Sequence, residues 1–169
     1  MKKNLFISCL FVMFLGLASA FAAKPTAAQI EQAAAVRKAM AESRDYTLYI
    51  NRGANNTRGG SIPIAAVVRI EGSEVYSSLP YWGDARNTAF SSSDAAMRFT
   101  ANITEYEVTE GKKNKTIVNM SAVNPGGQTY KLRFEIFYNG RVDLSTSGSN
   151  VQPMSYSGVI GPTTDGDTE

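Results

Sequence analysis

One segment of the chain indicates its fold more clearly than the rest: residues 130–140 read YKLRFEIFYNG. Apolar side chains alternate here with charged ones, and this period of two is typical of a β-strand with one buried face. Asn139-Gly140 is the favoured pair for a two-residue hairpin turn, so residues 141–146 are expected to return as the next strand. The segment therefore predicts an antiparallel sheet that covers a core.

The same alternation occurs elsewhere in the chain, between turns and loops rich in Gly, Asn, Pro and Ser. The apolar parity shifts by one residue near Thr104-Glu105, which predicts a β-bulge there. About eight strands joined mostly by short turns predict a mainly β fold, an antiparallel meander that closes into a barrel and hides its edges. An open sheet packed against a helix is the alternative. The further strands are expected at residues 45–50, 62–70, 75–82, 97–108, 116–123 and 153–160, with loops at 52–61 and 83–96.

A helix is expected before the strands. Pro25 and Thr26 form a start signal with Thr26 as the N-cap, and residues 27–43 are rich in good helix formers. Because its apolar stripe is thin, the helix is expected to lie on the outside of a sheet or to plug one end of the barrel, and docking onto a partner is the alternative. The expected layout is a signal peptide at residues 1–22, an N-terminal helix at 23–44, a β-barrel domain at 45–160 and a disordered tail at 161–169.

The N-terminus has the pattern of an export signal. Lys2 and Lys3 precede an apolar run over residues 5–17, and small residues follow that permit cleavage after Ala20 or Ala22. The run is short for a bilayer span, so a retained membrane anchor is the less favoured alternative and no transmembrane span is expected after cleavage. Cys9 lies too early for lipid attachment and belongs to the signal. The exported chain then has no cysteine and forms no disulfide.

Composition and charge exclude several classes of function. The full chain has 17 basic and 15 acidic residues, and loss of Lys2 and Lys3 leaves 15 of each. A neutral exported domain lacks the basic excess of a nucleic-acid binder. The chain has no His, which excludes a Ser-His-Asp triad, a Cys-His pair and a His-ligated zinc. No cofactor and no metal are expected.

Three motifs occur in a distinctive order: SSLPYWG at residues 77–83, FEIFYNG at 134–140 and SYSG at 155–158. This combination resembles the exported Bacteroidetes proteins known as the domain of unknown function 4251 family, over approximately residues 39–160. The resemblance implies a lipocalin-like barrel with an N-terminal helix and a location in the periplasm or associated with the outer membrane. It implies no activity, because none is assigned to the family.

The first candidate site is the segment Leu79-Pro80-Tyr81-Trp82-Gly83. Pro80 stops ladder pairing, Gly83 permits a sharp exit, and two aromatic side chains lie beside a long loop, where they can stack on a ligand or anchor a partner. The alternative is a structural corner in which Tyr81 and Trp82 fill the barrel end. From these residues we expect a non-catalytic cell-envelope protein that binds a small apolar or amphipathic ligand, or a protein partner, at the barrel mouth.

Other candidates have plainer interpretations. The dispersed carboxylates suit solvated strand faces better than a hydrolase with a paired acid and base. The basic turn of Lys112, Lys113 and Lys115 suits a hairpin tip better than an anionic lipid site. Asp165, Asp167 and Glu169 lack the further ligands of a calcium loop. A structural or assembly factor of the envelope is therefore the main alternative function, ahead of a hydrolase that uses two of Glu71, Glu74, Glu105, Glu107, Glu110, Glu135 and Asp143.

Overall fold

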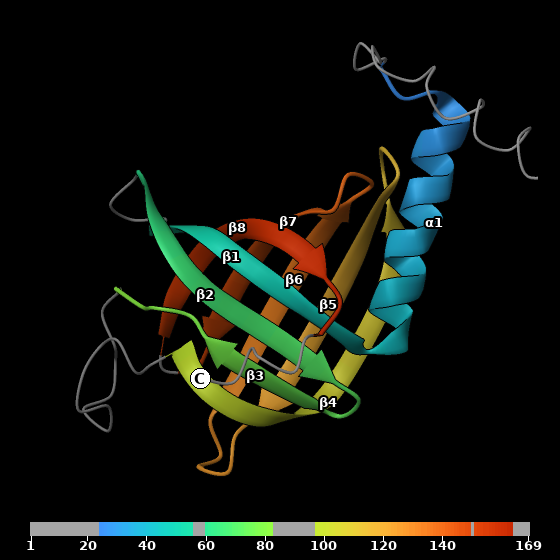
Figure 1. Cartoon of the computed structure of the whole chain (residues 1–169). Coiled ribbons are helices and arrows are strands. Elements are labelled where there is room, and N and C mark those ends of the chain that lie inside the picture. Colours follow the sequence, from blue (N-terminus) through green and yellow to red (C-terminus); the bar gives the residue numbers. More distant parts are fainter. Residues whose placement is uncertain (1–23, 56–59, 83–96, 150, 164–169) are drawn as a thin grey trace, which may run out of the picture.

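The chain folds as a closed antiparallel β-barrel with one N-terminal helix (Figure 1). The computed structural model describes residues 24–55, 60–82, 97–149 and 151–163. Each strand pairs with the next in sequence, and β8 pairs with β1 to close the barrel, so the predicted fold class is confirmed. The elements are α1 (Ala27–Ser43), β1 (Asp45–Asn55), β2 (Ser61–Glu71), β3 (Glu74–Ser78), β4 (Arg98–Gly111), β5 (Lys115–Val123), β6 (Thr129–Phe137), β7 (Arg141–Gly148) and β8 (Val151–Gly161).

The seam between β1 and β8 depends on a very close approach of the two backbones. Gly158 of β8 is paired with Ile50 of β1. A β-carbon at position 158 would overlap the carbonyl oxygen of Tyr49 and lie 2.8 Å from the Cα atom of Ile50. Only glycine fits there without displacing the strand, which explains the glycine at the end of the SYSG motif.

The inward-facing side chains fill the barrel. Every strand contributes to one continuous buried cluster, and the largest members, Tyr46, Tyr81 and Phe134, have no exposed surface. Phe99 and Tyr130 stack across the interior, with ring centroids 3.7 Å apart. The barrel is therefore a packed core along the part of its length that these residues occupy.

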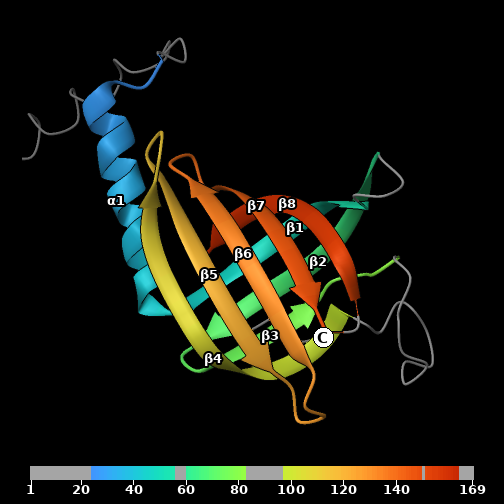
Figure 2. The ribbon, with the colours of Figure 1, turned by 180° about the vertical axis from the view of Figure 1, so that it is seen from behind.

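Helix α1 lies beside one end of the barrel, close to the β4–β5 and β6–β7 turns (Figures 1 and 2). Its N-terminus has the expected cap, because the Thr26 hydroxyl accepts a hydrogen bond from the Gln29 backbone N–H and the Gln29 side chain accepts one from the Thr26 N–H. Ala41 is its one buried residue. The thin apolar stripe predicted from the sequence thus covers the barrel end rather than entering a large core.

Polar contacts hold α1 to the barrel. The Tyr106 hydroxyl donates a 2.7 Å hydrogen bond to the Ala41 carbonyl and lies 2.8 Å from the Tyr46 hydroxyl. Since Tyr106 uses its single proton on Ala41, Tyr46 is the donor to Tyr106. Lys38 Nζ is 2.6 Å from Glu110 Oε1, and this contact lowers the pKa of Glu110. Two partly buried tyrosine hydroxyls and one exposed ion pair therefore hold the helix to the barrel.

The predicted bulge in β4 is confirmed, since the register shifts between Ile103 and Glu105. Three other expectations were wrong. β1 continues through residues 52–55, which were expected to be loop, because pairing with β2 and β8 outweighs the Gly and Asn content. β3 ends at Ser78 and not at Trp82, since Pro80 cannot continue the ladder. The β6–β7 turn uses residues 138–140, and only Gly140 has a positive φ, of 83°, whereas a two-residue type I′ turn needs two such residues.

Candidate functional site at the barrel mouth

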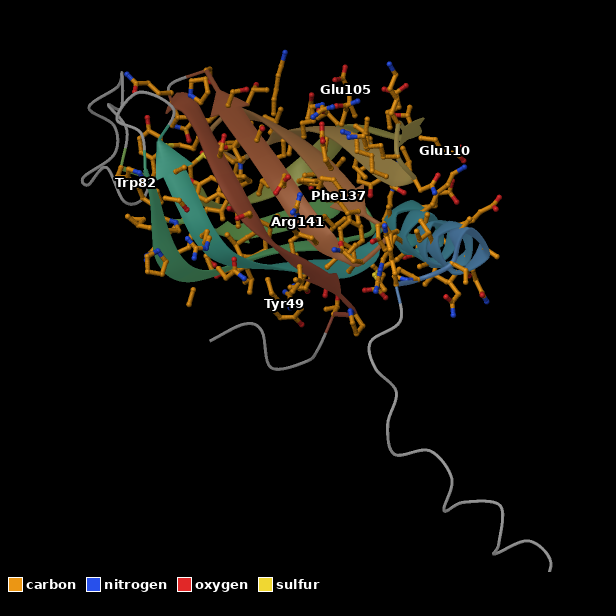
Figure 3. All side chains as sticks on the ribbon, turned by 90° about the horizontal axis from the view of Figure 1, so that it is seen from above. Tyr49, Trp82, Glu105, Glu110, Phe137 and Arg141 are labelled. Atoms are coloured by element: carbon orange, nitrogen blue, oxygen red, sulfur yellow. The ribbon has the colours of Figure 1, made fainter. Side chains whose placement is uncertain are left out.

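The candidate segment 79–82 leaves β3 and covers the barrel end that lies away from α1; Figure 3 shows Trp82 at that end. Leu79 and Tyr81 are fully buried, while Pro80 and Trp82 are partly exposed. Gly83 lies outside the described residues. The segment therefore presents two apolar side chains inward and leaves the indole of Trp82 at the barrel mouth.

The SSLPYWG motif at residues 77–83 and strand β8, which carries the SYSG motif, meet at this mouth. The Tyr156 hydroxyl of β8 donates a 2.8 Å hydrogen bond to the Pro80 carbonyl, and the backbone N–H of Gln152 donates one of 2.8 Å to the Tyr81 hydroxyl. The Tyr156 ring also meets Trp82 edge to face, with centroids 6.1 Å apart. Residues more than 70 positions apart in sequence thus form one site, which no local pattern predicts.

Gly53 provides the space for the indole. It pairs with Tyr156 across the β1–β8 seam, and a β-carbon there would overlap Cη2 of Trp82 and lie 2.9 Å from Cζ2. Burial raises the pKa of Tyr156 above its usual range, so its hydroxyl stays protonated and remains a donor to Pro80 at neutral pH. The position of Trp82 is therefore fixed by a glycine on one side and a neutral tyrosine on another.

The rim of the mouth has an exposed apolar side. Ile62, the cross-strand partner of Gly53, is 50% exposed, and Ile64 is only partly buried. Both continue the inward parity of Val68 and Ile70 toward the end of β2. Trp82, Ile62 and Ile64 therefore give the mouth a shallow apolar surface, which we call the mouth patch, above a filled interior.

The dispersed carboxylates act mainly as partners of basic side chains. Glu71 forms an ion pair with Arg69, and Glu110 forms one with Lys38. Glu135 pairs with both Lys115 and Arg133, and Asp143 pairs with Arg141. The adjacent Lys115 and Arg133 hold the pKa of Glu135 below its ordinary value, the opposite of the shift that a general acid needs. Lys112 and Lys113 are exposed at the β4–β5 turn. Ion pairs of this kind are typical of the solvated outer surface of a barrel.

The described residues hold neither a metal-binding cluster nor a helix that could span a membrane. They contain no cluster of three or more His, Cys, Asp or Glu side chains able to hold a metal ion. Within the same ranges, no helix has the length and apolar character needed to cross a bilayer. The tail acids Asp165, Asp167 and Glu169, and the signal-peptide segment, lie outside the described part of the chain.

Together these features define a small antiparallel β-barrel with a packed interior, closed at one end by a helix and at the other by an aromatic segment. The chain belongs to the family described as "Domain of unknown function (DUF4251)", which it matches over residues 28–160. It is also similar in fold to a crystal structure of a DUF4251 family protein from Bacteroides eggerthii DSM 20697, with a TM-score of 0.62 and 11% sequence identity over 80% of this chain and 91% of that chain. No curated protein matches the chain.

Proposed function

We propose that the protein is an exported, non-catalytic binding protein of the bacterial cell envelope, and that it holds a protein partner at the mouth patch. The observation that carries this proposal is the position of Trp82, which rests on Gly53 and Tyr156 with its indole partly exposed. Partly exposed Trp side chains in fixed positions are typical anchors of protein interfaces. Ile62 extends the same apolar surface.

A protein partner suits this surface better than a small ligand inside the barrel. A site for a small apolar molecule needs an enclosed space of several hundred Å³, whereas Leu79, Tyr81 and Met97 are fully buried directly behind the mouth. A ligand would have to displace them. A shallow apolar patch with a central aromatic side chain instead suits an interface in which the partner supplies the second surface.

Site-specific photo-crosslinking in cells tests the mouth patch. A photoreactive phenylalanine at position 62 is expected to trap one defined protein, whereas the same group at Val36, which is 54% exposed on α1, serves as the matched control. Trp82→Ala should reduce the adduct at position 62 at least about tenfold, since anchors of this kind contribute about 2 kcal/mol or more. Equal labelling from both positions, or a small molecule that copurifies in native mass spectrometry, would contradict the proposal.

Export is a separate part of the proposal and has its own measurement. Cleavage after Ala20 or Ala22 predicts an exported chain that begins at Phe21 or Ala23, which intact mass and N-terminal sequencing of the cell fraction will identify. We expect this product in the periplasm or at the outer membrane. A full-length chain in the inner membrane would instead support the retained anchor.

A further inference from the structure

A groove of about 770 Å³ runs over the outside of the barrel, across β4 to β8. Figure 2 shows these strands side by side, and Figure 3 shows Glu105 pointing away from the barrel. The groove lies on a different surface from the mouth patch, so its role does not depend on the proposed function. Its outward-facing lining residues are Glu105, Glu107, Asn119, Ser121, Lys131 and Arg133, with small side chains of β7 and β8 beyond them.

The β4 bulge sets the charge pattern of this groove. After the register shift, Glu105 is paired with Ser121 and Glu107 with Asn119. On the other side of β5, Ser121 is paired with Lys131 and Asn119 with Arg133. Each of these two rows across the strands therefore runs from an acid on β4, through a short polar residue on β5, to a base on β6. As a result, an acidic edge on β4 and a basic edge on β6 lie on either side of the short side chains of β5.

The two edges do not neutralise each other. Glu105 accepts a 2.8 Å hydrogen bond from the Ser121 hydroxyl, and Arg133 pairs with Glu135 at 2.6 Å. Glu107 and Lys131 form no ion pair with another described residue. Since β4 and β6 are two strand spacings apart, about 9.5 Å, opposite charges face each other across a gap that one extended chain can occupy.

The spacing of these charges along β4 and β6, which is across the groove, matches that of an extended peptide. Glu105 and Glu107 are two residues apart on β4, and Lys131 and Arg133 are two residues apart on β6. This gives a repeat of about 6.6 to 6.8 Å on each edge, the same as the repeat of side chains on one side of any extended strand. In such a strand, successive side chains point to opposite sides.

We propose that this groove binds an extended peptide segment in which basic and acidic side chains alternate. The peptide crosses the groove along β5, with its basic side chains toward Glu105 and Glu107 and its acidic ones toward Lys131 and Arg133. The short side chains of Asn119 and Ser121 leave room for its backbone and offer hydrogen bonds. An anionic polymer would meet the two glutamates as like charges, so nucleic acid and acidic polysaccharide are disfavoured.

Binding of synthetic peptides to the purified protein tests the proposal by fluorescence anisotropy. The probes are fluorescent KEKEKEKE and its block isomer KKKKEEEE, which has the same composition and net charge but lacks the alternation. We expect the alternating peptide to bind at least about tenfold more tightly, and its affinity to fall as salt rises from about 0.05 M to about 0.5 M. Equal binding of the two peptides, or preference for a soluble acidic polysaccharide over both, would overturn the proposal.

Matched charge reversals locate the binding site. Glu107→Lys places a base beside Glu105 on the acidic edge and should weaken binding of KEKEKEKE at least about fivefold. Glu74→Lys makes the same charge change at an exposed site on β3 and should leave binding unchanged. Lys131→Glu should weaken binding in the same way as Glu107→Lys. Both glutamates are exposed, so thermal unfolding will verify that the barrel is intact. Equal effects of Glu107→Lys and Glu74→Lys on peptide binding would refute the assignment. Trp82→Ala should leave peptide binding unchanged, and this result distinguishes the groove from the mouth patch.

Discussion

The indole of Trp82 occupies the space that a side chain at Gly53 would need, and this relationship ties the β3–β4 connection to the β1–β8 seam. Gly53→Ala should therefore displace the indole and destabilise the fold by about 1–3 kcal/mol. Trp82 is the only tryptophan of the chain, so its fluorescence reports the displacement directly. We expect a red-shifted emission together with a lower Tm.

The matched control for this change is Gly126→Ala in the exposed β5–β6 turn, where the nearest atom to a new β-carbon would be the Asn124 side-chain oxygen at 3.3 Å. That variant should leave the Trp82 emission unchanged. If Gly53→Ala also kept the emission and the stability of the parent protein, the tight packing of Trp82 on Gly53 would be refuted.

The hydroxyl of Tyr106 joins α1 to the barrel, and its removal should loosen the helix. Tyr106→Phe leaves the Ala41 carbonyl with the longer 3.4 Å hydrogen bond from the Arg44 backbone N–H and leaves the Tyr46 hydroxyl without its acceptor, for a cost of about 1–3 kcal/mol. We expect amide hydrogen exchange in the variant to be faster than in the parent protein, and the increase to be larger in residues 27–43 than in the strands. Tyr76→Phe, at a partly exposed tyrosine of β3, is the control and should have little effect on α1 exchange.

Gly158 permits the closure of the barrel, so this position should tolerate no side chain. Gly158→Ala brings the new β-carbon against the backbone of Tyr49 and Ile50, which has no flexible end that can move aside. We expect a loss of about 3 kcal/mol or more, measured by urea unfolding. Gly161→Ala is the comparison, since its nearest neighbour is the Tyr49 ring, and a loss there as large as at Gly158 would argue against a special role for the seam.

Glu135 should make part of the stability depend on acid pH. Its pKa is lowered below the ordinary value of 4.5 by Lys115 and Arg133, so the unfolded chain binds this proton first as the pH falls. The stabilisation is present above about pH 4.5 and is lost as the pH falls through the lower folded-state pKa. Glu135→Gln should thus cost about 0.5–1 kcal/mol at pH 7 and less in acid.

Urea unfolding over a pH series checks this difference between the parent protein and Glu135→Gln. Glu107→Gln, which changes an exposed glutamate outside the ion pairs described, is the control. A gap between the parent protein and Glu135→Gln that stays constant or widens as the pH falls below 4.5 would contradict the assigned ion pairs.

Much of the fold follows from patterns within single segments. The alternation in residues 130–137 assigns each side chain of β6 to the core or to the outside, and the parity shift at Thr104-Glu105 marks the bulge. The N-cap at Thr26 and the turn residues are also visible locally. The β6–β7 turn differs from the prediction because Asn139-Gly140 suits two turn geometries, and the paired strands decide which one forms.

The candidate site was only partly predictable. The motif at residues 79–83 was visible as an aromatic corner, but nothing near it in sequence indicated that Gly53, Ile62 and Tyr156 lie around Trp82. The groove was missed altogether, because Glu105, Glu107, Lys131 and Arg133 each appear as ordinary solvated residues of separate strands. A comparison of charges at equal positions in neighbouring strands would have found it once the register was known.

The side of each strand that faces the core, the positions of the turns and the helix before the sheet follow from the sequence alone, since they depend on the conformational and solvation preferences of neighbouring residues. The register of the strands around the closed barrel is set by the folded structure. That register brings Trp82 onto Gly53 and places the acids of β4 opposite the bases of β6. Local sequence does not specify this register, because pairing between distant strands is selected by the packing of the whole core, which no single segment contains.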